Sequence, residues 1–352
     1  MRKKIIIWIV LFIFGALIFY FFSSFSYGYG TDYSHPKLTK EAAGLFNRFS
    51  PERQISQQET EWLIKGAIEE DTPLRYINHF YDPIYNQPWL GTSPVALTAK
   101  DWAQSPNYQK MYIFSKGDQS WQKAVGSYIK GDKESSFIAL GHILHLIEDM
   151  AVPEHTRNDT HLPYVDESPY EKWAEKNSSK IKINENQGVQ SYFGLEEYFY
   201  FLANFSNKNF FSNDTIDKNY DNPVINNKEI KYFTKLNGDI SAYAMSKIDN
   251  YEFRLVQIIE EKKWQENKNT AIYRIDDDVA TDYFSLLAPK AISYGAGVIK
   301  LFFDEAEKQK QIKQQKTWWE RIKDSANDFY FSVSGSLYSG VIPPLGRETV
   351  AP

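Results

Sequence analysis

Apolar residues recur every three to four positions through most of the chain, a spacing that is typical of amphipathic helices. The clearest segments are 56–68, 121–130, 135–150 and 279–302. We see no long alternation of apolar and polar residues and no internal repeat. The pattern therefore predicts an all-α, multi-helix fold.

Local signals support the ends of these segments. Ser56 and Glu59 have the spacing of a capping box, which predicts that a helix begins there. Gly131 and Pro153 follow two other segments, where glycine and proline commonly end helices. Pro289 lies inside the longest segment and predicts a kink in that helix.

The N-terminus has the character of a targeting segment. Arg2, Lys3 and Lys4 precede an apolar run of 18 residues, Ile5–Phe22. A signal-peptide core has about 7–15 apolar residues and a spanning helix about 20, so the run fits either a cleaved signal or an anchor. Residue 26 ends a small-x-small motif that allows cleavage. Both alternatives predict an extracytoplasmic protein, secreted or membrane-anchored.

These features predict three parts. Residues 1–30 are the signal peptide or signal-anchor helix, 31–305 are the helical domain, and 306–352 are a helical extension with a flexible C-terminal tail. Within the helical domain, residues 204–229 are rich in Asn, Asp and Lys and predict a surface excursion.

Composition narrows the class of protein. Hydrophobic residues make up 42% and charged residues 24%, as in folded globular proteins. The chain has no cysteine, which excludes disulfides, thiolate metal ligands and cysteine nucleophiles. The net charge is −5, and three basic residues lie at the N-terminus, so the rest is more acidic still. We therefore expect no stable binding to duplex nucleic acid.

Candidate chemistry gathers in one short stretch. The chain has six histidines, and four of them lie between residues 142 and 161. His145 and Asp149 are four residues apart, so a helix presents both on one face. His155 follows Pro153, where the chain can fold back over that face. An imidazole and a carboxylate so placed can bind a metal cation, although an isolated pair of this kind is often structural.

The stretch resembles a known superfamily. Residues 140–155 read L-G-x3-H-x3-D-x3-P-x-H, a full match to the pattern of the zinc-dependent phospholipase C superfamily, which also contains the fungal single-strand-specific nucleases. The N-H-F-Y-D-P segment at 78–83 resembles the family's His-Phe-Tyr-Asp-Pro segment. Ser34-His35 resembles its N-terminal histidine, and Tyr170-Glu171-x-Trp173 resembles the segment with its glutamate ligand. The motifs cover residues 31–175 and lie in the family's order.

The resemblance implies an all-helical domain with three zinc sites. The first site would take Asp71, His79, His145 and Asp149. Asp71 precedes a proline by two residues, as in the family, although its interval to the histidine is shorter. Glu69 or Glu70 is therefore an alternative ligand, and a solvated helix end is an alternative for all three acidic residues.

The second and third sites depart from the family. The second would take His155, Glu171 and either His161 or Glu167, and we expect His161 because zinc favours imidazole nitrogen. The third would take His35 and Asp149 with the amino group of an N-terminal tryptophan, which this sequence lacks. We therefore expect two zinc ions and leave the third open.

His142 has no counterpart among the family's ligands. We expect a buried histidine that bonds a backbone carbonyl, and the alternative is a residue that supports a neighbouring ligand.

The resemblance implies a zinc-dependent phosphoester hydrolase. Asp149 would bridge two cations and Asp71 would orient water, which makes both catalytic. We expect phospholipase C-like action on a phospholipid or another phosphodiester, at a membrane reached through the N-terminal segment. A nuclease or nucleotidase of the same fold is one alternative. Another is a non-catalytic envelope interaction domain with a structural metal site, for which Trp318-Trp319 would be the contact.

Overall fold

The structure is a computed structural model. It describes residues 34–72, 74–91, 96–111, 113–161, 167–182, 186–216, 220–226, 228–235, 238–263 and 268–337. The predicted signal or anchor segment at 1–30 lies outside the described residues, as does the tail from residue 338.

Helices dominate the described chain, as the sequence predicts. They are α2 (His35–Phe49), α3 (Gln57–Glu70), α4 (Ala99–Trp102), α5 (Pro106–Gln109), α6 (Trp121–Lys130), α7 (Lys133–Asp149), α8 (Pro153–Thr156), α9 (Pro169–Lys176), α10 (Leu195–Asn209) and α11 (Asp277–Leu337). Short 3-10 helices are η2 (Tyr76–Asn78), η3 (Ser178–Lys180) and η4 (Asn213–Thr215).

Several local predictions are confirmed. Ser56 and Glu59 form the reciprocal capping box at the start of α3. Gly131 ends α6 with a φ of 86°, a left-handed conformation that glycine adopts without steric cost.

The predicted surface excursion at 204–229 is partly wrong, because α10 continues to Asn209 and the next two side chains, Phe210 and Phe211, are buried.

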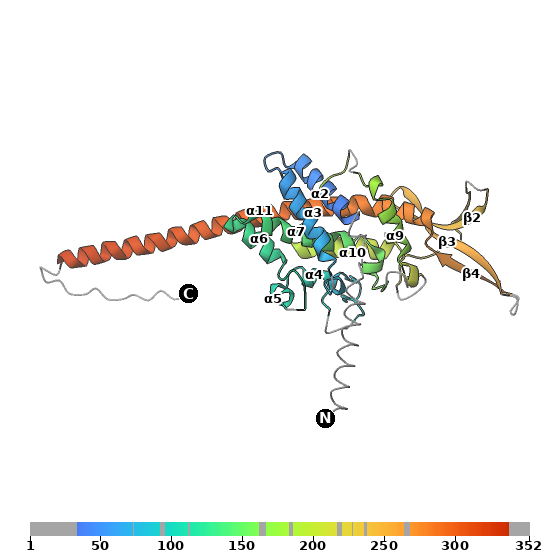
Figure 1. The fold of residues 1–352 in the computed structure, drawn as a ribbon, viewed down its shortest axis with the longest axis horizontal. Coiled ribbons are helices and arrows are strands. Elements are labelled where there is room, and N and C mark those ends of the chain that lie inside the picture. Colours follow the sequence, from blue (N-terminus) through green and yellow to red (C-terminus); the bar gives the residue numbers. More distant parts are fainter. Residues whose placement is uncertain are drawn as a thin grey trace, which may run out of the picture. The chain divides into compact units, whose positions relative to one another are not determined.

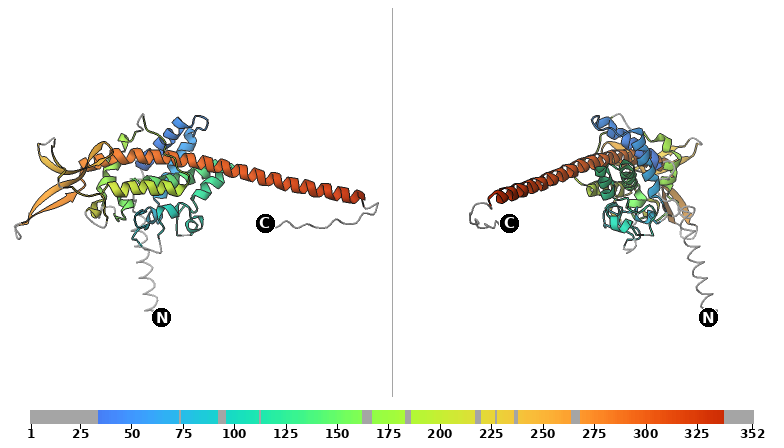
Figure 2. Two further views of the ribbon diagram at one scale, coloured as in Figure 1. Left: turned by 180° about the vertical axis from the view of Figure 1, so that it is seen from behind. Right: turned by 60° about the vertical axis from the view of Figure 1, so that its left-hand side comes forward.

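A small antiparallel sheet corrects the purely all-α prediction. Its strands are β1 (Ile230–Thr234), β2 (Ile240–Ile248), β3 (Tyr251–Lys263) and β4 (Lys268–Arg274), in the order β1-β2-β3-β4. The sheet projects at one end of the helical body, beside the start of α11 (Figures 1 and 2). Tyr283 of α11 donates a hydrogen bond to the carbonyl of Leu255 in β3.

Two features conceal these strands in the sequence. The buried side chains of Ser241 and Gln257 are polar, and they bond each other at 3.1 Å between Nε2 and Oγ. A shift of register between Ala244 and Met245 also breaks the alternation along β2. The strands therefore lack the regular apolar and polar alternation that signals a half-buried sheet.

The helix pair α3 and α7 forms the centre of the fold. The helices run parallel, because Leu63 approaches Gly141 and Ala67 approaches His145. A Cβ atom on Gly66 would lie 2.0 Å from the carbonyl oxygen of Ile138, and one on Gly141 would lie 2.1 Å from that of Leu63. Only glycine permits this contact, which brings the C-terminal ends of both helices together.

The chain divides into two compact units, Met1–Phe303 and Asp304–Pro352. In the first unit, the early part of α11 carries buried residues such as Val279, Leu287 and Val298 and continues through Pro289. In the second unit, α11 continues to Leu337, with Ile312 and Trp318 exposed. The domain boundaries given above remain a prediction.

By length and composition alone, Asp277–Gln315 is apolar enough to cross a membrane. Within its most apolar window, 67% of the residues are buried, as in the core helix of a soluble protein.

Candidate metal centre

The fold brings six histidines and several carboxylates into one buried region. His35 opens α2, Asp71 follows the end of α3, and His79 follows η2. His145 and Asp149 lie on the last turns of α7. The remaining members lie in α8, α9 and the segment between them, and they are His155, His161 and Glu171.

The first predicted group converges. The carboxylate of Asp149 lies 3.0 Å from Nδ1 of His79 and 3.3 Å from Nε2 of His145. Asp71 lies 3.6 Å and 3.7 Å from the same two nitrogens. Asp71, His79 and His145 offer ligand atoms within 4.8 Å of one another, a separation at which one cation can bind all three.

The second predicted group also converges. Glu171 lies 3.2 Å from Nε2 of His155 and 2.7 Å from Nε2 of His161. Glu167, the alternative to His161, has an exposed side chain that pairs with Lys172. The geometry therefore favours His161 over Glu167.

A third group forms around His35. Its Nε2 lies 3.4 Å from Asp149, and its ring stacks on that of His145 at 3.7 Å between centroids. His35, His145 and Asp149 again offer ligand atoms within 4.8 Å. The N-terminal amine, which the resemblance implies as a further ligand of this site, lies outside the described residues.

Asp149 joins the three groups. Its Oδ1 faces His35, whereas its Oδ2 faces His79, His145 and, at 3.6 Å, His155. A carboxylate with separate partners on its two oxygens has the arrangement needed to bridge two cations.

The donor set fits a cation. Both carboxylate oxygens of Asp71 and both of Asp149 are buried and receive no hydrogen bond of acceptable geometry. Oε1 of Glu171 is also buried and likewise receives no hydrogen bond. Because a buried carboxylate without a partner is strongly destabilising, these oxygens need positive charge. Imidazole nitrogen and carboxylate oxygen together are a typical ligand set for zinc.

The pKa shifts reflect the excess of carboxylates in this region, which favours the protonated form of the neighbouring imidazoles. Burial alone lowers the pKa of His79, but Asp149, Glu70 and Asp71 outweigh it and raise the pKa to about 10. Burial opposes ionisation of Asp149, yet its histidine neighbours hold its pKa well below the usual range. Without a metal, protons on the imidazoles would therefore balance the carboxylates.

Hydrogen bonds at the outer nitrogens orient several rings. Nδ1 of His145 donates to the carbonyl of Ala67 at 2.7 Å, which turns Nε2 toward Asp149. Nδ1 of His35 bonds Glu148 at 2.7 Å. Such contacts fix the tautomer of metal-binding histidines.

Glu70 is a buried hub beside the centre. It pairs with Arg75 at 2.7 Å, accepts a bond from Trp102 at 2.6 Å and lies 3.7 Å from Nε2 of His79. Nδ1 of His142 also bonds its carboxylate, so the expected backbone carbonyl partner of His142 is wrong. Glu70 supports His79 rather than replacing Asp71.

All eight residues predicted as ligands lie in this region. Glu69, the other alternative to Asp71, instead pairs with Lys116 at 3.0 Å. Glu148 was not among the residues predicted from the sequence, although its interval of three residues from His145 places it near the same face of α7. Glu154 was likewise not predicted. It is buried and accepts a bond from Ser168, and burial and Glu171 raise its pKa to about 8.

Comparisons with known proteins add a distant structural likeness. No family model and no curated protein sequence matches the chain. Among solved structures, alpha toxin from Clostridium absonum is similar, with a TM-score of 0.42 and 13% identity over 80% of this chain and 67% of that chain. Alpha-toxin from an avian strain of Clostridium perfringens gives a TM-score of 0.41 and 13% identity, over 80% and 66%. Similarity of this extent does not show membership of a family.

Proposed function

We propose that this protein is a zinc-dependent phosphoester hydrolase of the phospholipase C type. The observation that supports it is the convergence of Asp71 and Asp149, whose buried oxygens lack hydrogen bonds, with the imidazoles of His79 and His145. The sequence pattern that resembles the zinc-dependent phospholipase C superfamily runs through the same residues. Phosphodiester hydrolysis is the chemistry that such a site serves best.

In this proposal the two groups of ligands hold two zinc ions. One would be held by Asp71, His79, His145 and Asp149, and the other by His155, His161 and Glu171. Bound zinc lowers the pKa of water and neutralises charge on a phosphoryl group.

The chain's own residues have distinct roles. Oδ2 of Asp149 lies between the two groups, because it faces His79 of the first and His155 of the second, whereas Oδ1 faces His35. Asp71 orients the attacking water and accepts its proton at a carboxylate oxygen. Burial raises the pKa of Asp71 in the metal-free protein. A bound zinc ion would lower that pKa, so only the oxygen of Asp71 that does not bind zinc could accept the proton.

We also propose that the activity lies outside the cytoplasm. The basic N-terminus and the apolar run at residues 5–22 support export, either anchored or after cleavage. A phospholipid or another phosphodiester at a membrane is then the accessible substrate.

A second candidate is a non-catalytic domain that keeps a structural metal. Its support is burial: Asp149 and His155 are fully buried, and His161 is only 7% exposed. A catalytic metal needs a coordination position that substrate can reach.

The test is hydrolysis of bis(p-nitrophenyl) phosphate, phospholipid vesicles and single-stranded DNA by chelated and zinc-reloaded protein. We expect zinc to restore cleavage, with vesicles preferred over DNA. Asp149→Asn keeps the size but removes the charge, so it should reduce activity to the metal-free level. Asp221→Asn, at an exposed position, is the matched control and should keep full activity.

If zinc raises the melting temperature but none of the three substrates is cleaved, the non-catalytic candidate is correct. Cleavage of DNA without cleavage of vesicles would favour a nuclease.

A further inference from the structure

The loop at residues 83–91, called the apolar loop below, displays three large apolar side chains to solvent. Ile84 is 44% exposed, Tyr85 54% and Leu90 62%. The apolar loop carries no charged residue, and the sequence has none as far as residue 99. Single exposed apolar residues are ordinary on a protein surface, but a group of them on one uncharged loop indicates a contact surface.

Contacts hold the apolar loop against the second group of metal ligands. Phe80, which precedes the loop, stacks on the ring of His155 at 4.7 Å between centroids. Within the loop, Nε1 of Trp89 donates to Oγ1 of Thr160 at 3.0 Å, and Thr160 is next to His161 in the sequence. The exposed apolar side chains therefore belong to a loop that borders the metal centre.

The backbone of the apolar loop satisfies much of its own hydrogen bonding. Oδ1 of Asp82 accepts from the N–H groups of Ile84, at 2.8 Å, and Tyr85, at 3.2 Å. Asp82 and Gln87 exchange backbone hydrogen bonds at 3.0 and 3.2 Å. Two residues of the loop are prolines, which have no N–H. Backbone donors that are already paired reduce the cost of moving a loop from water into a less polar phase.

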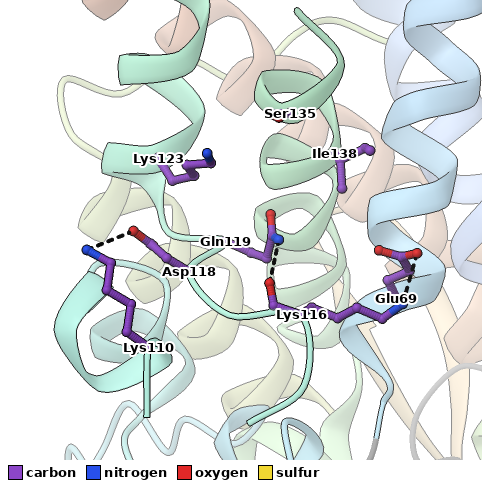
Figure 3. A pocket seen from close by; sticks show the side chains of 8 residues that line it. All are labelled: Glu69, Lys110, Lys116, Asp118, Gln119, Lys123, Ser135 and Ile138. Carbon is purple, nitrogen blue, oxygen red and sulfur yellow. Dashed lines mark hydrogen bonds and ion pairs between the residues drawn. The ribbon is translucent and has the colours of Figure 1, made fainter. Parts of the chain in front are cut away.

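The surface beside the C-terminal end of α3 has the opposite character. Figure 3 shows Lys110, Lys116 and Lys123 around a cleft there, and the first two pair with Asp118 and Glu69. Such charges keep a surface hydrated, because their transfer to a less polar phase is costly. The apolar loop has no charge to desolvate, so it is better suited to contact a membrane.

We propose that the apolar loop enters the interfacial region of a phospholipid bilayer and brings the metal centre to the lipid headgroups. This inference deepens the proposed function and rests on it for the substrate. Aliphatic side chains such as Ile84 and Leu90 favour the acyl-chain boundary, whereas tyrosine and tryptophan are enriched at the interface with water. The apolar run at residues 5–22, which is predicted to direct the chain to or across a membrane, favours a bilayer over a protein partner.

Fluorescent labelling tests the contact directly, because the chain has no cysteine. Leu90→Cys gives a unique site in the apolar loop for an environment-sensitive dye. The full-length, zinc-loaded protein is reconstituted into phosphatidylcholine vesicles, with and without phosphatidylcholine that carries a doxyl quencher near its headgroup. We expect a blue shift of the emission and quenching by the doxyl lipid. The quencher stays in the bilayer even if the headgroup is cleaved.

Phe193→Cys is the matched control. The side chain of Phe193 is 99% exposed, more than that of Leu90, but Glu196 and Glu197 follow it closely. The same dye at residue 193 should keep the emission that it has in water. Equal quenching at the two positions, or none at residue 90, would overturn the proposal. A blue shift at residue 90 without quenching would also overturn it, because it indicates contact with a protein.

Hydrolysis provides a second readout. Ile84→Ser/Leu90→Ser should lower cleavage of the same vesicles about tenfold, which corresponds to about 1.4 kcal/mol. Its melting temperature and its cleavage of bis(p-nitrophenyl) phosphate should match those of the wild type. Phe193→Ser should change neither rate. An equal loss on both substrates would overturn the proposal, since it would show that the loop supports the metal centre itself.

The two readouts separate this proposal from the proposed function. If the wild type cleaves neither substrate, the proposed function fails. The fluorescence measurement then still decides whether the apolar loop enters the bilayer, because it does not depend on hydrolysis.

Discussion

At the scale of single residues, Glu148 fixes the orientation of the His35 ring. Its two oxygens accept bonds from Thr39 and His35, each at 2.7 Å, and all three side chains are buried. This contact directs the opposite nitrogen of His35 toward Asp149. The orientation of a metal-facing ring therefore depends on a residue that does not itself face the ligand cluster.

Replacement of Glu148 by Gln tests this dependence. The amide cannot accept from both partners, so His35 loses its fixed orientation. We expect the affinity of an ion bound between His35 and Asp149 to fall about 10–100-fold, as measured by competition with a chromophoric chelator. Glu134→Gln, at an exposed position of the same helix, should bind as wild type does. An unchanged affinity in Glu148→Gln would show that His35 needs no such support.

The histidine pKa values predict a pH dependence of stability in chelated protein. In the folded state the pKa values of His35, His79 and His161 are raised to about 10, against an unfolded value of about 6.5. Their stabilising contribution is complete below pH 6.5 and is lost as the pH rises toward 10.

We therefore expect the melting temperature of chelated protein to fall between pH 6.5 and 9.5. Zinc-loaded protein should not show this fall, because zinc binds neutral imidazole and its binding strengthens as protons leave. Parallel pH profiles for the two forms would contradict the raised pKa values.

At this scale, part of the site is predictable from local spacing in the sequence. The spacing of His145, Asp149 and His155 is set by one helix and the proline after it. The other ligands were implied only by the family resemblance, and they are His35, Asp71, His79, His161 and Glu171. The supporting acids are harder to predict, because Glu70 and Glu148 act across distances of 72 and 113 residues. Such contacts depend on packing, which the spacing of residues does not report.

Among the elements, the contact between α3 and α7 determines the position of the ligands. Asp71 follows one helix and His145 lies on the other, so any separation of the two helices lengthens the distance between their ligand atoms. Gly66 and Gly141 allow the backbones to touch.

Gly66→Ala should force the helices apart. The new methyl group would clash with the carbonyl of Ile138, which costs roughly 1–3 kcal/mol of stability. It should also weaken zinc binding. Gly126→Ala in α6 is the control, because no atom lies within 4 Å of the new group, and it should be neutral or stabilising by up to about 1 kcal/mol. Chemical unfolding and zinc titration measure both effects, and equal behaviour of the two variants would refute the argument.

The helices and the sheet differ in how well the sequence predicts them. The long helices are predictable because their apolar faces repeat over several turns and their ends carry capping residues. The sheet is not, since Ser241 and Gln257 place polar groups on its buried face and pair with each other there. A hydrogen bond between strands 16 residues apart has no counterpart in the hydropathy pattern.

At the scale of the whole molecule, the metal centre connects segments that are distant in sequence. Residues between His35 and Glu171 contribute to it, so cations bound there link α2, α3, α7 and α9. Removal of zinc should therefore lower the stability of the fold as a whole.

Treatment with a chelator should lower the melting temperature by about 5 °C or more. This corresponds to a loss of about 2.7 kcal/mol when zinc is present at 100 times its dissociation constant. Asp149→Asn should show a smaller shift, because part of its metal binding is already lost. Calorimetry with and without chelator measures both, and identical melting curves for the wild type would exclude a metal that supports the fold.

His35 lies at the very start of α2, so its distance from the apolar run limits how far the metal centre can lie from a membrane. Only 13 peptide units separate it from the end of the apolar run at Phe22. Fully extended, they span no more than about 45 Å. In a chain anchored by that run, the linker would keep His35, and with it the metal centre, within about that distance of the membrane. Dissolved substrates would then have to diffuse to the metal centre, whereas lipids of the anchoring membrane would lie within the reach of the linker.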